Sequence, residues 1–387
     1  MAIYLDHAAT APINDAAITA LNTQMRKLGN ASSVHNPGRE VRKDVEDARH
    51  KLSELVNSNP SEIIFTGSGT EANNLAIKGF FWQSPDRNVI VTSAFEHHAI
   101  LDPVEWLVEH EGAEQVLIPI TKAGVIDLDF LAKVVEARGS EIAVISIMHS
   151  NNELGSIQPI SEVVKIAGDI PVHTDAVQSF GKVDFDFQKL GVTAATISAH
   201  KVGGPLGIAA LILRRGLDLT PILHGGGQER EIRSGTLNAP AIVAFAAASE
   251  FAIANRSANF AKIRELRDYF IAGLKRVVPE VSINSISDPA LPGIVNATFP
   301  GTESDALLLL LDTEGISASA GSACSAGVPR PSHVLVALGL SESDADASLR
   351  ISIGTTNIKA EIDQVLAVMP SVVERARNAF VVSGLNK

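Results

Sequence analysis

The chain has 387 residues, of which 45% are hydrophobic and 20% charged, and its formal net charge is −12 at pH 7. This composition is typical of an ordinary soluble globular protein, and the length predicts two domains or one elaborate domain. The acidic balance argues against broad binding of nucleic acid or of anionic membranes.

No targeting or membrane segment is visible in the sequence. Residues 1–6 lack the basic stretch and apolar stretch of a signal peptide, and the densest apolar run, 307–311, is too short to span a bilayer. The single cysteine excludes an internal disulfide and a multi-cysteine metal site, and the 11 histidines are scattered. We therefore expect a cytoplasmic protein with no membrane association and no bound metal.

Short apolar runs alternate with helical patterns in the first two thirds of the chain. Apolar residues at intervals of three and four predict amphipathic helices at 41–55 and 100–108. Apolar runs predict strands at 63–65, 89–91, 143–147, 171–173, 195–197 and 208–213. Because these strands are apolar throughout, we expect an α/β fold with a mainly parallel sheet covered by helices on both faces.

The last third of the chain has shorter and more mixed elements. Pro240 opens a helix of small residues, and a second long helix is predicted at 260–274. Strands at 294–295 and 351–353, a leucine-rich helix and a terminal helix follow. We expect a large domain at 16–258 and a small α+β domain formed by 1–15 and 259–387.

Three clusters of residues carry groups that could bind a single cofactor. Residues 65–74 (FTGSGTEANN) predict a strand, a glycine turn and a helix whose N-terminus, at Gly69 and Thr70, favours a phosphate. Asp175 ends a short strand, where open α/β sheets bind ligands, and Lys201 follows another strand. Taken singly, each cluster has an alternative explanation. The glycine turn could bind no ligand, Asp175 could be a helix N-cap, and Lys201 could be an exposed surface lysine.

Taken together, the three clusters supply what pyridoxal 5'-phosphate requires. The cofactor needs a cup for its phosphate, a carboxylate that keeps the ring nitrogen protonated, and a lysine that forms a Schiff base. The lysine must be neutral to attack the aldehyde, and burial beside a positive ring would lower its pKa.

Motifs along nearly the whole chain resemble the cysteine desulfurases of the NifS/IscS type, within the class V aminotransferase fold family. They are YLDHAAT at 4–10, GNASSVH at 29–35, EHHA at 96–99, NNELG at 151–155, GGGQER at 225–230 and RSGT at 233–236. The resemblance implies the type I fold of pyridoxal-phosphate enzymes, with a mainly parallel seven-stranded sheet in the large domain. It also implies a homodimer.

The resemblance also implies roles for individual residues. Lys201 would carry the Schiff base, Asp175 would pair with the ring nitrogen, and His97 would stack on the ring and act in acid–base catalysis. Further cofactor contacts are implied for Gly69, Thr70, Asn152, Gln178, Ser198, His200 and, toward the neighbouring subunit's phosphate, Thr236. Asn152 and Arg350 would bind the substrate, and the planar arginine fork suits its α-carboxylate.

Cys324 distinguishes the expected reaction from others on this fold. It lies in a run of small residues, SAGSACSAGVP at 319–329, which favours an exposed, mobile nucleophile over the buried side chain that most lone cysteines are. The implied reaction converts L-cysteine to L-alanine and leaves the sulfur on Cys324 as a persulfide. An acceptor protein would then take the sulfur: an iron–sulfur scaffold, with transient cluster ligation by Cys324, a tRNA-thiolation protein or another carrier.

Alternatives remain open at this point. An aminotransferase or selenocysteine lyase of the same fold shares most of the cofactor site, and a non-catalytic docking scaffold would retain only the fold. The chain departs from the family pattern at His7, Ala31, Gly203 and Leu206. None of these departures removes an expected catalytic group, but they leave the physiological branch undetermined.

Overall fold

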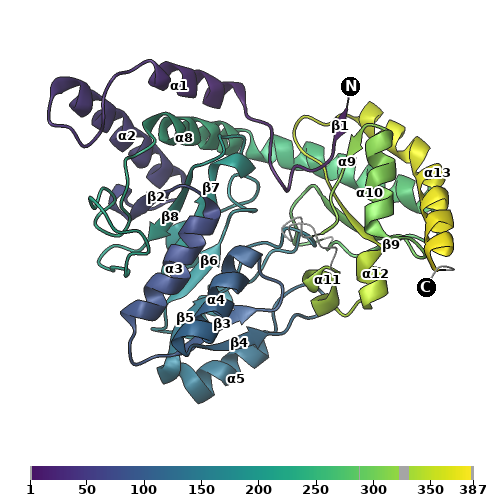
Figure 1. The fold of residues 1–387 in the computed structure, drawn as a ribbon, viewed down its shortest axis with the longest axis horizontal. Helices are drawn as coiled ribbons and strands as arrows, with labels where there is room; N and C mark the ends of the chain where they lie inside the picture. Colours follow the sequence, from purple (N-terminus) through teal and green to yellow (C-terminus); the bar gives the residue numbers. More distant parts are fainter. Residues whose placement is uncertain (1, 287, 322–330, 385–387) are drawn as a thin grey trace.

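The computed structural model describes residues 2–286, 288–321 and 331–384. Its centre is a seven-stranded sheet in the order β2-β8-β7-β6-β5-β3-β4 (Figure 1). The strands are β2 (Ile63–Thr66), β3 (Val89–Ser93), β4 (Glu114–Ile118), β5 (Ile142–Ser146), β6 (Val172–Asp175), β7 (Ala194–Ser198) and β8 (Ala209–Leu213). Only β8 runs against its neighbours, β7 and β2, so the expected mainly parallel sheet is confirmed.

Helices cover both faces of this sheet. Helices α3 (Gly69–Gln83) and α4 (His98–Glu111) pack on one face through residues such as Leu75 and Val104. The other face is covered by α2 (Asn36–Leu55), α6 (Ile160–Ala167) and α8 (Ala239–Ala254). Helices α1 (Asp15–Met25), α5 (Leu128–Arg138) and α7 (Phe187–Leu190) complete this part of the chain.

A second core lies beside the first (Figure 1). Strand β10 (Ile294–Thr298) pairs antiparallel with β9 (Ser282–Ile283) and β12 (Ser348–Ser352), and α9 (Arg256–Val277), α10 (Ser304–Thr313) and α13 (Lys359–Gly384) pack with them. At the N-terminus, β1 (Ile3–Tyr4) pairs parallel with β11 (Ile316–Ser317). The start of the chain therefore joins the C-terminal part, which supports the expected small domain.

The expected boundary at 258–259 falls inside α9. Two short helices, α11 (His333–Leu338) and α12 (Glu342–Asp346), contribute Val334, Leu335 and Ala345 to the core of the large sheet and not to the second core. The domain division stays a prediction. In the described part of the chain, none of the helices combines the length and hydrophobicity needed to cross a bilayer.

A buried ion pair ties α2 to the loop that follows β8. Arg49 Nη1 and Nη2 donate to Glu229 Oε2 and Oε1, both at 2.7 Å, and Phe65 N donates to Glu229 Oε2 at 2.8 Å. Because the Glu229 side chain is 1% exposed and that of Arg49 10%, loss of one partner leaves a charge with little access to water.

We therefore expect Glu229→Ala to lower the free energy of unfolding by about 3 kcal/mol, since it leaves a largely buried guanidinium with the exposed Glu46 as its remaining ionic partner. Urea denaturation followed by circular dichroism measures this change. The control is Glu141→Ala, which removes an ion pair with Arg138 on the surface and should hardly move the midpoint. Equal midpoints for the two variants would contradict the assignment.

Candidate active site

One cavity collects the residues singled out in the sequence, apart from Thr236 and Cys324. It has a volume of about 340 Å³ and lies at the carboxyl ends of β6 and β7. The expected residues that line it are Gly69, Thr70, His97, Asn152, Asp175, Gln178, Ser198, His200, Lys201 and Arg350. Thr236 is exposed and does not line this cavity, and Cys324 lies outside the described residues.

Asp175 is held at the end of β6 with both carboxylate oxygens engaged. Asn73 Nδ2 donates to Asp175 Oδ2 at 2.7 Å, and Val177 N donates to Asp175 Oδ1 at 2.9 Å. The helix that follows in the chain starts only at Phe187, so Asp175 is not a helix N-cap. Asn73 was not singled out in the sequence, although it lies one helical turn after Gly69 and so shares its face of α3.

Lys201 lies in the single 3-10 turn after β7, η3 (Ala199–Lys201). Its Nζ donates to the carbonyl oxygens of Ala8 and Ala9, at 2.6 and 2.7 Å. The side chain is therefore part of the cavity wall, and the alternative of an exposed loop lysine is wrong.

The two histidines beside Lys201 are held in the neutral form. His200 Nδ1 lies 3.1 Å from Thr10 Oγ1, and burial, with the nearby positive charge of Lys201, lowers its pKa to about 4. His97 Nδ1 accepts from Ala99 N at 3.0 Å, so the neutral ring carries its proton on Nε2. Burial also lowers the pKa of His97, and the charge of Asp175 opposes that shift.

Arg350 is the candidate anion-binding group. It lies in β12, its side chain is 4% exposed, and its Nη2 donates to Asp6 Oδ1 at 2.9 Å. Its Nε is buried and has no hydrogen-bond partner among the described residues. A buried guanidinium with an unsatisfied N–H suits a carboxylate ligand.

These residues fit pyridoxal phosphate. Helix α3 begins at Gly69, where a Cβ would lie 3.2 Å from Val177 Cγ2, so the closely packed turn favours glycine. Its N-terminus offers N–H groups to a phosphate, while Asp175 and Lys201 supply the carboxylate and the amine. In the described ranges no group of three or more His, Cys, Asp and Glu side chains could hold a metal ion.

Three departures from the family pattern lie at cavities. Leu206 is 72% exposed and lines the main cavity, whereas His7 is buried and lines a neighbouring pocket. A Cβ at Gly354 would lie 2.1 Å from His7 Nδ1, so glycine makes room for this ring. Gly203 lines the same pocket as His7 and has a φ of +81°, in the left-handed region that favours glycine. The fourth departure, Ala31, is buried.

A carboxyl group with a raised pKa lies directly before His97. Glu96 Oε1 accepts from Ser93 Oγ at 2.6 Å and from Met148 N at 2.8 Å, while its Oε2 is buried without a partner among the described residues. Burial raises the pKa of Glu96 from 4.5 to about 8. The folded chain therefore keeps a proton that the unfolded chain releases between these values, and stability falls as the pH rises through this window.

Glu96→Gln should remove this contribution, because an amide does not titrate. Relative to the unmodified chain, the variant's free energy of unfolding should increase steadily between pH 5 and pH 8, roughly the window of the raised pKa. Urea midpoints measured at several pH values for both chains test this. Parallel profiles would show that Glu96 does not titrate in this range.

Comparison with known proteins agrees with this geometry. Residues 3–365 match the family described as Aminotransferase class-V. An IscS-like cysteine desulfurase of Mycobacterium tuberculosis is 45% identical over 383 residues, 97% of each chain. A solved NifS-like protein superposes with a TM-score of 0.90 at 33% identity, covering 97% of this chain and 100% of that one.

A third relative is known with a small molecule. The solved structure described as SspA in complex with cysteine has a TM-score of 0.78 and 32% identity, and covers 92% of this chain and 100% of that one. These likenesses extend over nearly the whole length of the chain. The chain belongs to the class V aminotransferase family and, within it, to the cysteine desulfurases of the NifS/IscS type.

Proposed function

We propose that this chain uses pyridoxal phosphate to convert L-cysteine to L-alanine and carries the sulfur as a persulfide on Cys324 to an acceptor protein. The observation that carries the proposal is the single cavity onto which Asp175, Lys201, Arg350 and the N-terminus of α3 all open. The relative solved with cysteine supports the choice of substrate.

The described residues divide the work of binding. Gly69, Thr70 and Ser198 would hold the phosphate, Asp175 the ring nitrogen and Lys201 the aldehyde carbon. When bound, the cofactor supplies an electron sink for the negative charge that develops on the substrate's α-carbon. Arg350 binds the α-carboxylate, which replaces Asp6 as the partner of its guanidinium.

Proton movement falls to groups at the centre of the cavity. Lys201 Nζ, once neutral, accepts the proton from the α-carbon. His97 carries a proton on Nε2 and is a second donor in the same cavity. The Cys324 thiolate then attacks the substrate sulfur: an S–S bond forms, the Cβ–S bond breaks, and alanine leaves after its β-carbon takes a proton.

A homodimer and a protein that accepts the sulfur complete the proposal. The exposed position of Thr236, outside its own chain's cavity, is compatible with a role in a neighbouring subunit and supports a homodimer. The acceptor is proposed to be an iron–sulfur scaffold, with transient cluster ligation by Cys324, or a tRNA-thiolation protein. A cytoplasmic location stays a prediction.

Removal of the nucleophile should separate cofactor binding from sulfur transfer. We expect Cys324→Ser to keep the visible absorbance of the bound cofactor and to lose sulfide release by about a hundredfold or more, because a hydroxyl cannot take the sulfur. Lys201→Ala should lose that visible band. Sulfide and alanine are assayed with cysteine and a reductant, and Ser325→Ala serves as the control.

Equal amounts of sulfide and alanine support desulfuration, whereas transfer of the amino group to a keto acid would indicate an aminotransferase. Undiminished sulfide release from Cys324→Ser would eliminate the persulfide route. A chain that stays colourless with pyridoxal phosphate would favour the docking scaffold.

Arg350→Lys should weaken substrate binding while keeping the positive charge. We expect KM for L-cysteine to rise about tenfold with a smaller change in kcat, since the paired hydrogen bonds of the guanidinium are lost. Steady-state kinetics measure this, and the matched control is Arg375→Lys at an exposed position. An unchanged KM would show that Arg350 does not bind the substrate.

A further inference from the structure

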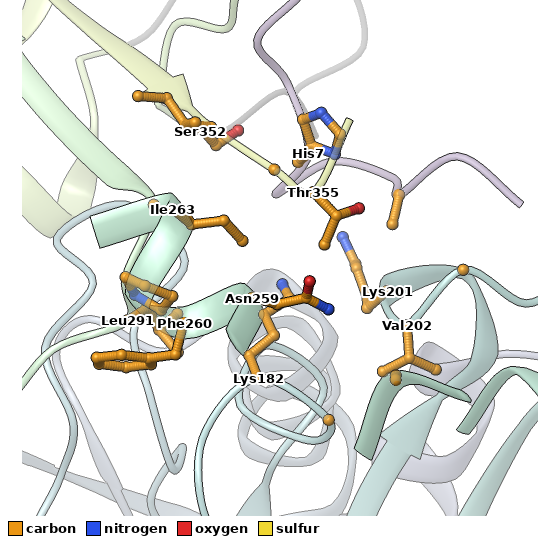
Figure 2. Close-up of a pocket in the computed structure, with 18 of the residues that line it drawn as sticks. His7, Lys182, Lys201, Val202, Asn259, Phe260, Ile263, Leu291, Ser352 and Thr355 are labelled. Carbon is orange, nitrogen blue, oxygen red and sulfur yellow. The ribbon is translucent and has the colours of Figure 1, made fainter. Parts of the chain in front are cut away.

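A second pocket, of about 130 Å³, shares Ala8 and Lys201 with the main cavity. Its walls come from the N-terminal segment, the turn at 181–182, helix α9 and the end of β12. Figure 2 shows Lys182 and Lys201 among the residues that line it, together with His7, Asn259 and Thr355. No aspartate or glutamate is among its described lining residues, so two lysine amines share a space without a lining carboxylate.

Lys182 is connected to Lys201 through a chain of hydrogen bonds. Lys182 Nζ donates to Gln178 Oε1 at 3.1 Å, and Gln178 Nε2 donates to the Ala8 carbonyl at 2.8 Å. The same Ala8 carbonyl accepts from Lys201 Nζ at 2.6 Å. Lys182 therefore fixes which way the Gln178 amide faces, because an ammonium or amine donor requires the amide oxygen.

The charges that act on the pKa of Lys182 are positive. Burial, and then Lys201 and Arg350, lower the pKa of Lys182 to about 7. The titratable groups that face it are His7 of the N-terminal segment, His200 and Lys201 of η3, Arg256 of α9 and Arg350 of β12. Each of the two arginines is paired with an aspartate, Arg256 with Asp184 and Arg350 with Asp6. The negative charge of Glu361 acts on His7, whose pKa it raises.

We propose that Lys182 is a positioning residue for Lys201. Lys182 orients Lys201 through Gln178 and the Ala8 carbonyl, and its positive charge opposes protonation of Lys201. The proposal rests on the proposed function in one respect only, the attachment of the cofactor at Lys201. Two amines this close cannot both be protonated without cost, so a proton on one disfavours a proton on the other.

The test is a pH titration of the visible absorbance of the holoenzyme, in which the midpoint reports protonation of the nitrogen at Lys201. Lys182→Met removes the charge and the donor at similar length, and should raise this midpoint by about one unit. It should also lower kcat about tenfold with KM little changed, since Gln178 and Lys201 lose their alignment.

Lys182→Arg keeps a charge and a donor, and should restore the midpoint and most of kcat. Lys182→Gln, which keeps a donor but no charge, should raise the midpoint while lowering kcat less, and it serves if the methionine variant does not fold. Lys189→Met, at an exposed lysine on the same segment, is the control.

An unchanged midpoint in Lys182→Met, or an arginine variant that shifts as far as the methionine one, would overturn the proposal. The titration needs no turnover of cysteine. If the chain bound the cofactor but released no sulfide, the proposed reaction would fail, while the shift in midpoint would still decide the role of Lys182.

Discussion

The parallel pairing of β6 with β7 is the constraint on which the active site depends. Asp175 pairs with Thr196 across the two strands, and the chain then reaches Lys201 through one 3-10 turn. This pairing brings a carboxylate and an amine to one edge of the sheet, where the N-terminus of α3 also opens onto the cavity. Because parallel strands end at the same edge, the register of the sheet places three chemically different groups around one space without a flexible loop.

The N-terminal segment joins this edge to the second core. Its strand β1 pairs with β11, Asp6 holds Arg350, and the carbonyls of Ala8 and Ala9 hold Lys201. The group proposed to bind the substrate carboxylate and the lysine proposed to bind the cofactor are thus attached to the same few residues. In the proposed function, a substrate that replaces Asp6 at Arg350 would act on the segment that also holds Lys201, which would connect substrate binding to the position of the lysine.

Periodicity and motifs predicted most of the large sheet, because most of its strands contain a short apolar run and its helices have one buried face. Strand β4 was not predicted, since it lies at the edge and has exposed residues such as Glu114 and Leu117. Val108, the last apolar residue of the amphipathic helix predicted at 100–108, is 39% exposed. Local patterns indicated Gly69, Thr70, Asp175 and Lys201, and the other cavity residues were found through motifs shared with a family. Asn73 was missed because its contact with Asp175 joins distant segments, and Lys182 because its bond to Gln178 leads to the Ala8 carbonyl, far away in the sequence. The roles assigned to the cavity residues stay predictions, as does that of Cys324, which lies outside the described residues.

The proposed reaction requires the cofactor to be attached at Lys201, between Asp175 and the N-terminus of α3. Reduction of the loaded chain with borohydride fixes the cofactor to the lysine that holds it, and peptide mass spectrometry then identifies that lysine. We expect the label on the peptide that contains Lys201 and none on the peptide that contains Lys182. A label at Lys182, or no label on either peptide, would contradict the account.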